Sequence, residues 1–214
     1  MRRATLIFAL LITPILPACG GGGGEDPPQY ELVEQRVLHT PSRTGTVYST
    51  TFVEVGAETM AAGDLDGGQG ARALLSFPLG SLPDPAEIQS ITYVDAQSGF
   101  TGAPYGSLGD LVVVDTDIGP SLSADDYDEP PVSVVLGTLS TSVTAGPRSI
   151  DLTAWILSLQ DAGAQRVDLM VRFEDETDSD GVADMVWLRS AGHAEGPGYL
   201  QILRRVRRAD GLAP

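Results

Sequence analysis

Short runs that alternate hydrophobic and polar residues recur along most of the chain, separated by glycine, proline and aspartate. In the clearest run, RVDLMVRF at Arg166–Phe173, every second side chain is apolar. A period of two predicts a strand with one buried face. Ten such runs predict an all-β fold, an antiparallel sandwich. They lie at Tyr30–Leu38, 46–55, 72–77, 88–96, 110–115, 132–139, 148–151, Arg166–Phe173, Asp184–Arg189 and 198–203.

One segment, DLTAWILSLQDAG, has a helical period instead. Its apolar residues are Leu152, Trp155, Ile156 and Leu159. Asp151 or Thr153 can cap the start of a helix, and Gly163 can end it. The pattern predicts one short helix over an open end of the sandwich, with Trp155 in the core.

The chain starts with Met1, Arg2 and Arg3, followed by a short apolar run. This run is too short for a membrane span, which needs about 20 residues, so residues 1–18 are predicted to be a signal peptide. Leu16 to Cys19 resembles a bacterial lipobox. Cys19, the single cysteine, is therefore the predicted lipidation site, and residues 19–29 form a flexible tether. The alternative is a secreted protein with a free thiol.

Charge narrows the classes of partner. The chain has 29 acidic residues, 13 basic residues that are all arginine, and a net charge of −16. Such an acidic surface repels nucleic acid. It suits a protein at the outer membrane or cell surface, where the lipid anchor would be its membrane contact. We expect one monomeric domain at residues 30–205 and a tail at 206–214.

The segment EDETDSDGVAD carries the pattern with the most specific chemistry. Glu176, Asp178, Asp180 and Asp184 fall at the first, third, fifth and ninth positions of a calcium loop, with Gly181 at the sixth. Alternate oxygens converge on the ion, and glycine permits the turn. The glutamate expected at position twelve is replaced by tryptophan. The interpretations are a structural Ca²⁺ site, to which Asp64 and Asp66 could contribute, or a solvated acidic turn.

Three side chains are candidates for ligand binding. In the run Asp184–Arg189, Trp187 and Arg189 share the face opposite to the apolar core residues, and Arg172 occupies the outward face of Arg166–Phe173. Tryptophan stacks on sugar rings, and arginine forks bind carboxylates. These residues therefore suit a polysaccharide ligand. In the alternative, Trp187 belongs to a small satellite core, and the arginines pair with Asp168 and Asp95.

Four segments together resemble the DNRLRE-type domains. They are ARALLSFPLGSLPDPAEIQSITYVDAQ, TGAPYGSLGDLVVVDTDIGPSLSADDY, SIDLTAWI and DGVADMVWLRSAGHAEGPGYLQIL. The resemblance covers residues 30–205 and implies a jelly-roll β-sandwich similar to carbohydrate-binding modules, in a family with members that bind acidic polysaccharide. The hexapeptide of the family name is absent, and the resemblance assigns no ligand-binding residue here.

These patterns favour a lipid-anchored module of the cell envelope that binds polysaccharide or mediates adhesion without catalysis. One alternative is a structural envelope or matrix protein that contacts other surface proteins, stabilised by calcium. Another is a carboxylate-based enzyme that degrades glycans. Little supports catalysis, because His39 and His193 are the two histidines and no nucleophile motif accompanies them.

Overall fold

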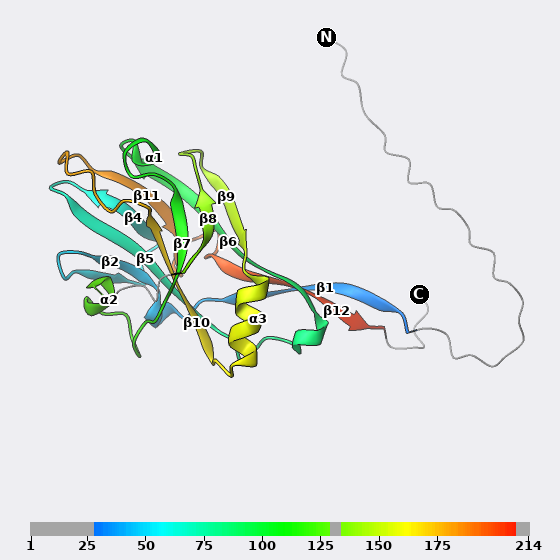
Figure 1. Ribbon diagram of the computed structural model, residues 1–214. Helices are drawn as coiled ribbons and strands as arrows, with labels where there is room; N and C mark the ends of the chain where they lie inside the picture. The colour runs from blue at the N-terminus through cyan, green and yellow to red at the C-terminus, as the bar shows by residue number, and fades with distance from the viewer. Residues whose placement is uncertain (1–27, 129–133, 209–214) are drawn as a thin grey trace, which may run out of the picture.

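Antiparallel strands make up most of the computed structural model, which describes residues 28–128 and 134–208 (Figure 1). This confirms the predicted all-β fold. The strands are β1 (Tyr30–Leu38), β2 (Gly45–Tyr48), β3 (Val53–Val55), β4 (Thr59–Leu65), β5 (Gln69–Pro78), β6 (Ile88–Thr101), β7 (Leu111–Thr116), β8 (Val135–Ser140), β9 (Gly146–Asp151), β10 (Arg166–Phe173), β11 (Asp184–Arg189) and β12 (Tyr199–Arg207). The helices are η1 (Pro41–Arg43), η2 (Pro85–Glu87), α1 (Pro104–Ser107), α2 (Asp125–Asp128) and α3 (Thr153–Asp161).

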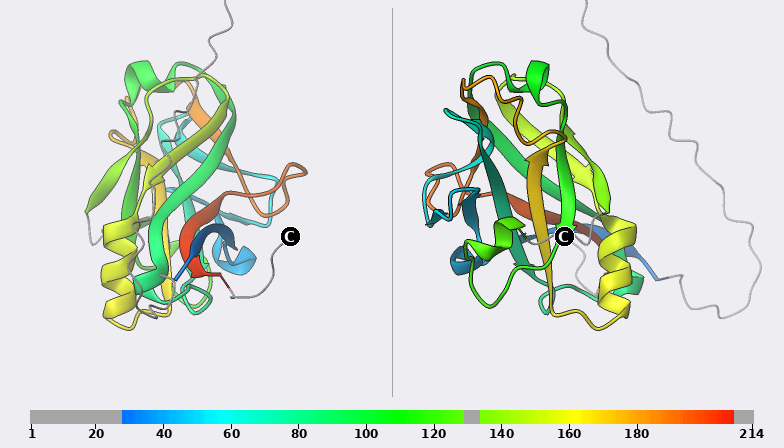
Figure 2. Two further views of the ribbon diagram at one scale, coloured as in Figure 1. Left: turned by 90° about the vertical axis from the view of Figure 1, so that its right-hand side faces the viewer. Right: turned by 60° about the vertical axis from the view of Figure 1, so that its left-hand side comes forward.

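The strands form one sheet, and nine of them follow the order β1-β12-β6-β11-β4-β5-β10-β7-β8. Outside this path, β2 pairs with β3 and β5, and β9 pairs with β6. The long strand β6 pairs with β12 and then with β11 along one edge, and with β9 along the other. The sheet therefore curls into a half-barrel, and its two halves face each other across a shared core (Figure 2). This is the sandwich that the strand pattern predicts.

The main core lies between the facing halves of the sheet. Its largest fully buried side chains include Tyr93, Phe77 and Phe173, and the ring centroids of Phe77 and Tyr93 are 6.0 Å apart in an edge-to-face contact. His39 packs edge-on against Phe77. Burial lowers the pKa of His39 to about 4, so this histidine is neutral at physiological pH and belongs to the packing.

The helix α3 confirms the prediction from helical spacing. Asp151 accepts hydrogen bonds from the backbone N–H and the hydroxyl of Thr153, and Gly163, at φ +78°, follows the last turn. Ile156 is fully buried in the core. Trp155 is partly exposed and packs against the same core. Figure 1 shows α3 at the end of the body opposite to α1.

The expectation that β10 buries one face is wrong. Asp168 and Met170 on its outer face are also buried, because the segment that includes α2 covers part of this face. Ile118, Leu122 and Tyr127 from that segment pack with Val47 of β2 and Leu74 of β5 in a second cluster. Asp168 accepts hydrogen bonds from the Ile118 N–H at 3.0 Å and from Arg166 Nε at 2.8 Å.

Several strand boundaries also differ from the prediction. The run 46–55 is a hairpin of β2 and β3, with Thr51 at φ +68° in the turn. The hydrophobic pattern does not predict strand β4, because its sequence, TMAAGDL, is poor in β-branched and aromatic residues. Strand β12 continues to Arg207, which pairs with Tyr30, so the first residues of the predicted tail belong to the sheet.

Candidate metal centre and ligand surface

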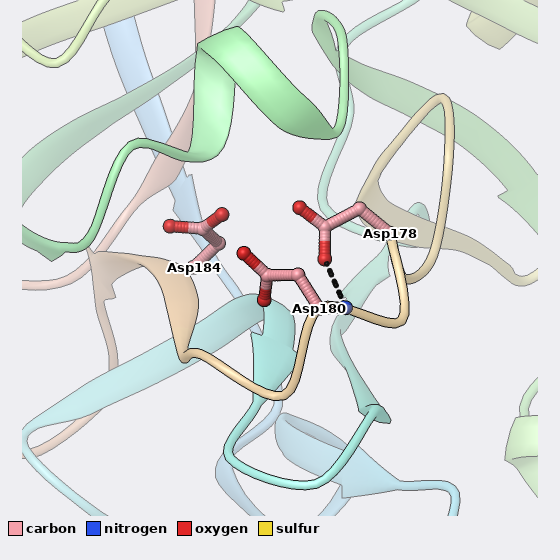
Figure 3. A group of neighbouring side chains, drawn as sticks. All are labelled: Asp178, Asp180 and Asp184. Carbon is pink, nitrogen blue, oxygen red and sulfur yellow. Dashed lines mark hydrogen bonds between the residues drawn. The ribbon is translucent and has the colours of Figure 1, made fainter.

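Three aspartates of the β10–β11 connection meet at one end of the sandwich (Figure 3). Asp178 and Asp180 lie in the loop and are exposed, whereas Asp184 begins β11 and is buried. One carboxylate oxygen from each lies within 4.8 Å of the other two. This group could hold a metal ion, and its all-oxygen composition suits a hard cation.

Local hydrogen bonds shape the loop around these carboxylates. Asp178 Oδ1 accepts from the Asp180 N–H at 3.0 Å, and Asp180 Oδ1 accepts from the Val182 N–H at 2.7 Å. Aspartates form such turns readily, and Gly181 at φ +78° provides the left-handed backbone. The alternating spacing in the sequence therefore produces the expected convergence of side chains.

The buried Asp184 ties the centre to α1 and to the residue before it. Its Oδ1 accepts from the Ala103 N–H, and its Oδ2 accepts from the Ser107 hydroxyl. Gly102 lies so close that a Cβ on it would be 1.9 Å from Asp184 Oδ1. Glycine is required here by this close approach and by its φ of +68°.

Glu176, which the sequence places in the metal site, is not one of the three clustered acids. Glu176 forms an ion pair with Arg72 of β5, and its Oε2 accepts from the Tyr127 hydroxyl at 3.0 Å. The Arg72 guanidinium also lies 4.2 Å from the centroid of the Tyr127 ring. Because a guanidinium and a phenol hold its carboxylate, Glu176 joins α2 to β5 and lies outside the acidic group.

Trp187 lies on the outer face of β11, as the alternation predicts. It is partly exposed and packs against a small cluster of Ala61, Ala71 and Met185. Tyr48 packs against the same cluster and contacts the exposed Phe52 at a ring-centroid distance of 5.4 Å. We call Trp187, Tyr48 and Phe52 the aromatic patch. Met185, on the same face of β11, is buried in this cluster.

Arg172 does not join Trp187 and Arg189 in one surface. A shared surface would require β10 and β11 to be neighbours, but β4 and β5 lie between them in the sheet. Arg172 donates hydrogen bonds to the carbonyl oxygens of Phe173 and Glu174, at 2.6 and 3.0 Å. Its side chain therefore binds backbone carbonyl groups at the end of β10.

Arg189 lines a small pocket between the ends of β11 and β12, of about 120 Å³. Its guanidinium pairs with Glu195, and its backbone N–H donates to Asp95 Oδ1 at 3.2 Å. Asp95 is buried and also accepts from the Ala96 N–H at 2.6 Å and from the Tyr93 hydroxyl at 2.7 Å. Burial raises the pKa of Asp95 to about 7 against these hydrogen bonds.

Asp95 fills the place where β6 changes partners. Strand β12 pairs with β6 up to Val94, and β11 pairs with it from Gln97 onward. At this point the carboxyl group of Asp95 accepts from two backbone N–H groups, those of Ala96 and Arg189. The sequence gives no local sign of this role, because the gap depends on three strands far apart in the chain.

The chain matches no protein-family model, and no curated protein matches it. Cys19, with the predicted signal peptide and most of the tether, lies outside the described residues. Among the helices of residues 28–128 and 134–208, none combines the length and the apolar character that a membrane span requires. Lipid anchoring and membership of the DNRLRE family stay predictions from the sequence.

Proposed function

We propose that this chain is a non-catalytic binding or adhesion module for polysaccharide, held at the cell envelope by a lipid on Cys19. The aromatic patch is the observation that carries the proposal. Trp187 is half-buried on a sheet face and packs against the same small cluster as Tyr48, which contacts the exposed Phe52. Flat aromatic faces supported by a packed sheet provide the apolar contact on which sugar rings stack.

The sequence adds two independent supports. The resemblance to DNRLRE-type domains implies a fold similar to that of carbohydrate-binding modules, and the predicted lipobox would place the domain outside the cell. If the patch instead binds a protein, the chain is a structural envelope protein, and this alternative is an outcome of the same experiment.

A glycan array with the chain from Gly20 onward, which keeps every described residue, tests the proposal. We expect selective binding that Trp187→Ala weakens about tenfold, since one stacking contact is worth on the order of 1 kcal/mol beyond its area. Tyr30→Ala, at an exposed aromatic residue of β1, is the matched control and should leave binding unchanged. Absence of glycan binding would contradict the proposal, and co-purified surface proteins would then favour the structural alternative.

Lipidation has its own test. Mass spectrometry of the native N-terminus should find Cys19 acylated, because Leu16 to Cys19 resembles a lipobox and a glycine tether follows. An unmodified thiol, or cleavage at another residue, would contradict envelope anchoring while leaving glycan binding open.

We also propose that the cation at Asp178, Asp180 and Asp184 is Ca²⁺. Oxygen ligands from two exposed carboxylates and one buried carboxylate suit this ion, and extracellular calcium modules function with affinities of about 10⁻⁴–10⁻³ M. Bound calcium would stabilise the fold by mass action. Terbium luminescence excited through tryptophan, and displaced by Ca²⁺, should report binding, whereas a melting temperature independent of calcium would contradict it.

A further inference from the structure

Asp64, near the end of β4, is a buried carboxylate that forms no ion pair with any described residue. Its side chain is 0% exposed, and its Oδ2 accepts one hydrogen bond, from the Thr177 hydroxyl at 2.6 Å. Its Oδ1 is buried and has no hydrogen-bond partner among the described residues. A buried ionised group without compensation is strongly unfavourable, so this oxygen requires an explanation.

The register of the sheet places Asp64 beside the metal centre. Asp64 lies directly opposite Asp184 in the antiparallel pair of β4 and β11, so both side chains project from the same face, with Cβ atoms about 4.5–5.5 Å apart. On both strands this is the face of the main core, to which Met60 and Ala62 of β4 and Val186 of β11 contribute.

The metal-binding loop also folds over Asp64. The Thr177 hydroxyl that donates to Asp64 accepts a hydrogen bond from the Ser179 N–H at 3.0 Å. Asp178 and Asp180, which flank Ser179, are two of the clustered carboxylates. Thr177 therefore links Asp64 to the same turn that presents the exposed ligands.

Among the described residues, no basic side chain compensates these acids. Within residues 28–128 and 134–208, no arginine forms an ion pair with Asp64, Asp178, Asp180 or Asp184. Arg72, on the adjacent strand β5, pairs with Glu176. Four carboxylates, two of them buried, thus gather at one end of the sandwich, and a divalent cation is the species that would balance them.

We propose that Asp64 is the fourth acidic group of the cation site, and that its unpartnered Oδ1 serves the ion. Asp64 is not among the three residues whose oxygens lie within 4.8 Å of one another, so it acts through a water molecule on the ion, as calcium loops commonly do at one position. The ion then joins β4 and β11 to the loop between β10 and β11. This inference rests on the calcium site proposed above and adds a residue outside its loop.

The test compares Asp64→Asn with Asp66→Asn in the chain from Gly20 onward. Asp66, which the sequence also offered as a contributor, is exposed in the turn after β4 and lies outside the acidic group. Its variant is therefore the matched control. Terbium and calcium titrations give affinity, and thermal melts in EDTA and in excess Ca²⁺ give stability. For Asp64→Asn we expect binding weakened about tenfold or more, with a melting temperature in EDTA at or above that of the wild type. Asp66→Asn should match the wild type in every measurement.

Loss of calcium affinity without loss of stability in EDTA distinguishes a residue that serves the ion from a structural acid. If Asp64→Asn binds calcium with wild-type affinity, Asp64 does not serve the ion, although the three-aspartate site stands. If Asp64→Asn is less stable than the wild type in EDTA, or fails to fold there, the carboxylate is structural and the inference is wrong. If the wild type shows no response to terbium or calcium, the proposed calcium site itself fails.

Discussion

Asp95 in the middle of β6 and Asp64 near the end of β4 are both buried carboxylates, but their surroundings differ. Asp95 accepts from a phenol and two backbone N–H groups, and it fills a gap where strands diverge. Asp64 accepts one hydrogen bond, leaves one oxygen unpartnered and faces another buried aspartate across the sheet. Burial alone therefore does not identify a functional acid. The unsatisfied oxygen and the neighbouring like charges distinguish the candidate binding site from the structural residue.

Replacing Asp95 by alanine should produce the largest effect. The variant leaves the N–H groups of Ala96 and Arg189 and the hydroxyl of Tyr93 buried without their acceptor. Each such group costs about 1–3 kcal/mol, so we expect Asp95→Ala, which leaves three of them, to lower the free energy of unfolding by about 3–9 kcal/mol. Denaturant melts at pH 5 measure it. A loss below about 1 kcal/mol would show that Asp95 does not close the gap.

The pH dependence of stability in Asp95→Asn tests whether the buried Asp95 ionises less readily in the folded protein. The folded pKa of Asp95 is raised to about 7, so its contribution to stability is present below the unfolded pKa, near 4, and is lost as the pH rises to 7. His39, with its pKa lowered to about 4, acts in the opposite direction in this window. The test is therefore the difference between wild type and Asp95→Asn in melts from pH 4 to pH 8.

Between pH 4 and pH 7, the free energy of unfolding of Asp95→Asn should rise relative to that of the wild type by about 2–4 kcal/mol. Asparagine can still accept from both backbone N–H groups, and it does not ionise. Parallel pH profiles for the two proteins would mean that Asp95 ionises as readily when folded as when unfolded.

A smaller effect is expected at Gly102, which supports Asp184. A Cβ at Gly102 would lie 1.9 Å from Asp184 Oδ1, whereas one at Gly67 would meet nothing within 4 Å. Both glycines have positive φ, so Gly67→Ala controls for backbone strain alone. Gly102→Ala should be less stable than Gly67→Ala by about 1–3 kcal/mol. Equal melting temperatures would show that the segment before α1 does not constrain Asp184.

The sequence predicts those features that depend on near neighbours in the chain. Asp178, Asp180 and Asp184 converge because the spacing and Gly181 act within one loop. Glu176 lies apart from them because it pairs with Arg72, a residue 104 positions away in the sequence that the local pattern does not reveal. The sequence predicts one ligand surface with both Arg172 and Trp187, because alternation indicates the face of a strand but not the position of that strand in the sheet. The place of Asp64 opposite Asp184 depends on β4, which has few strand-forming residues.

The central claim is that the clustered aspartates bind a cation. A crystal of the chain from Gly20 onward, grown with terbium, tests it most directly through anomalous scattering. We predict one strong anomalous peak within about 2.3–2.6 Å of carboxylate oxygens of Asp178, Asp180 and Asp184, on the side that faces Asp64. A crystal without a peak at this position, at terbium concentrations well above 1 mM, would contradict the claim.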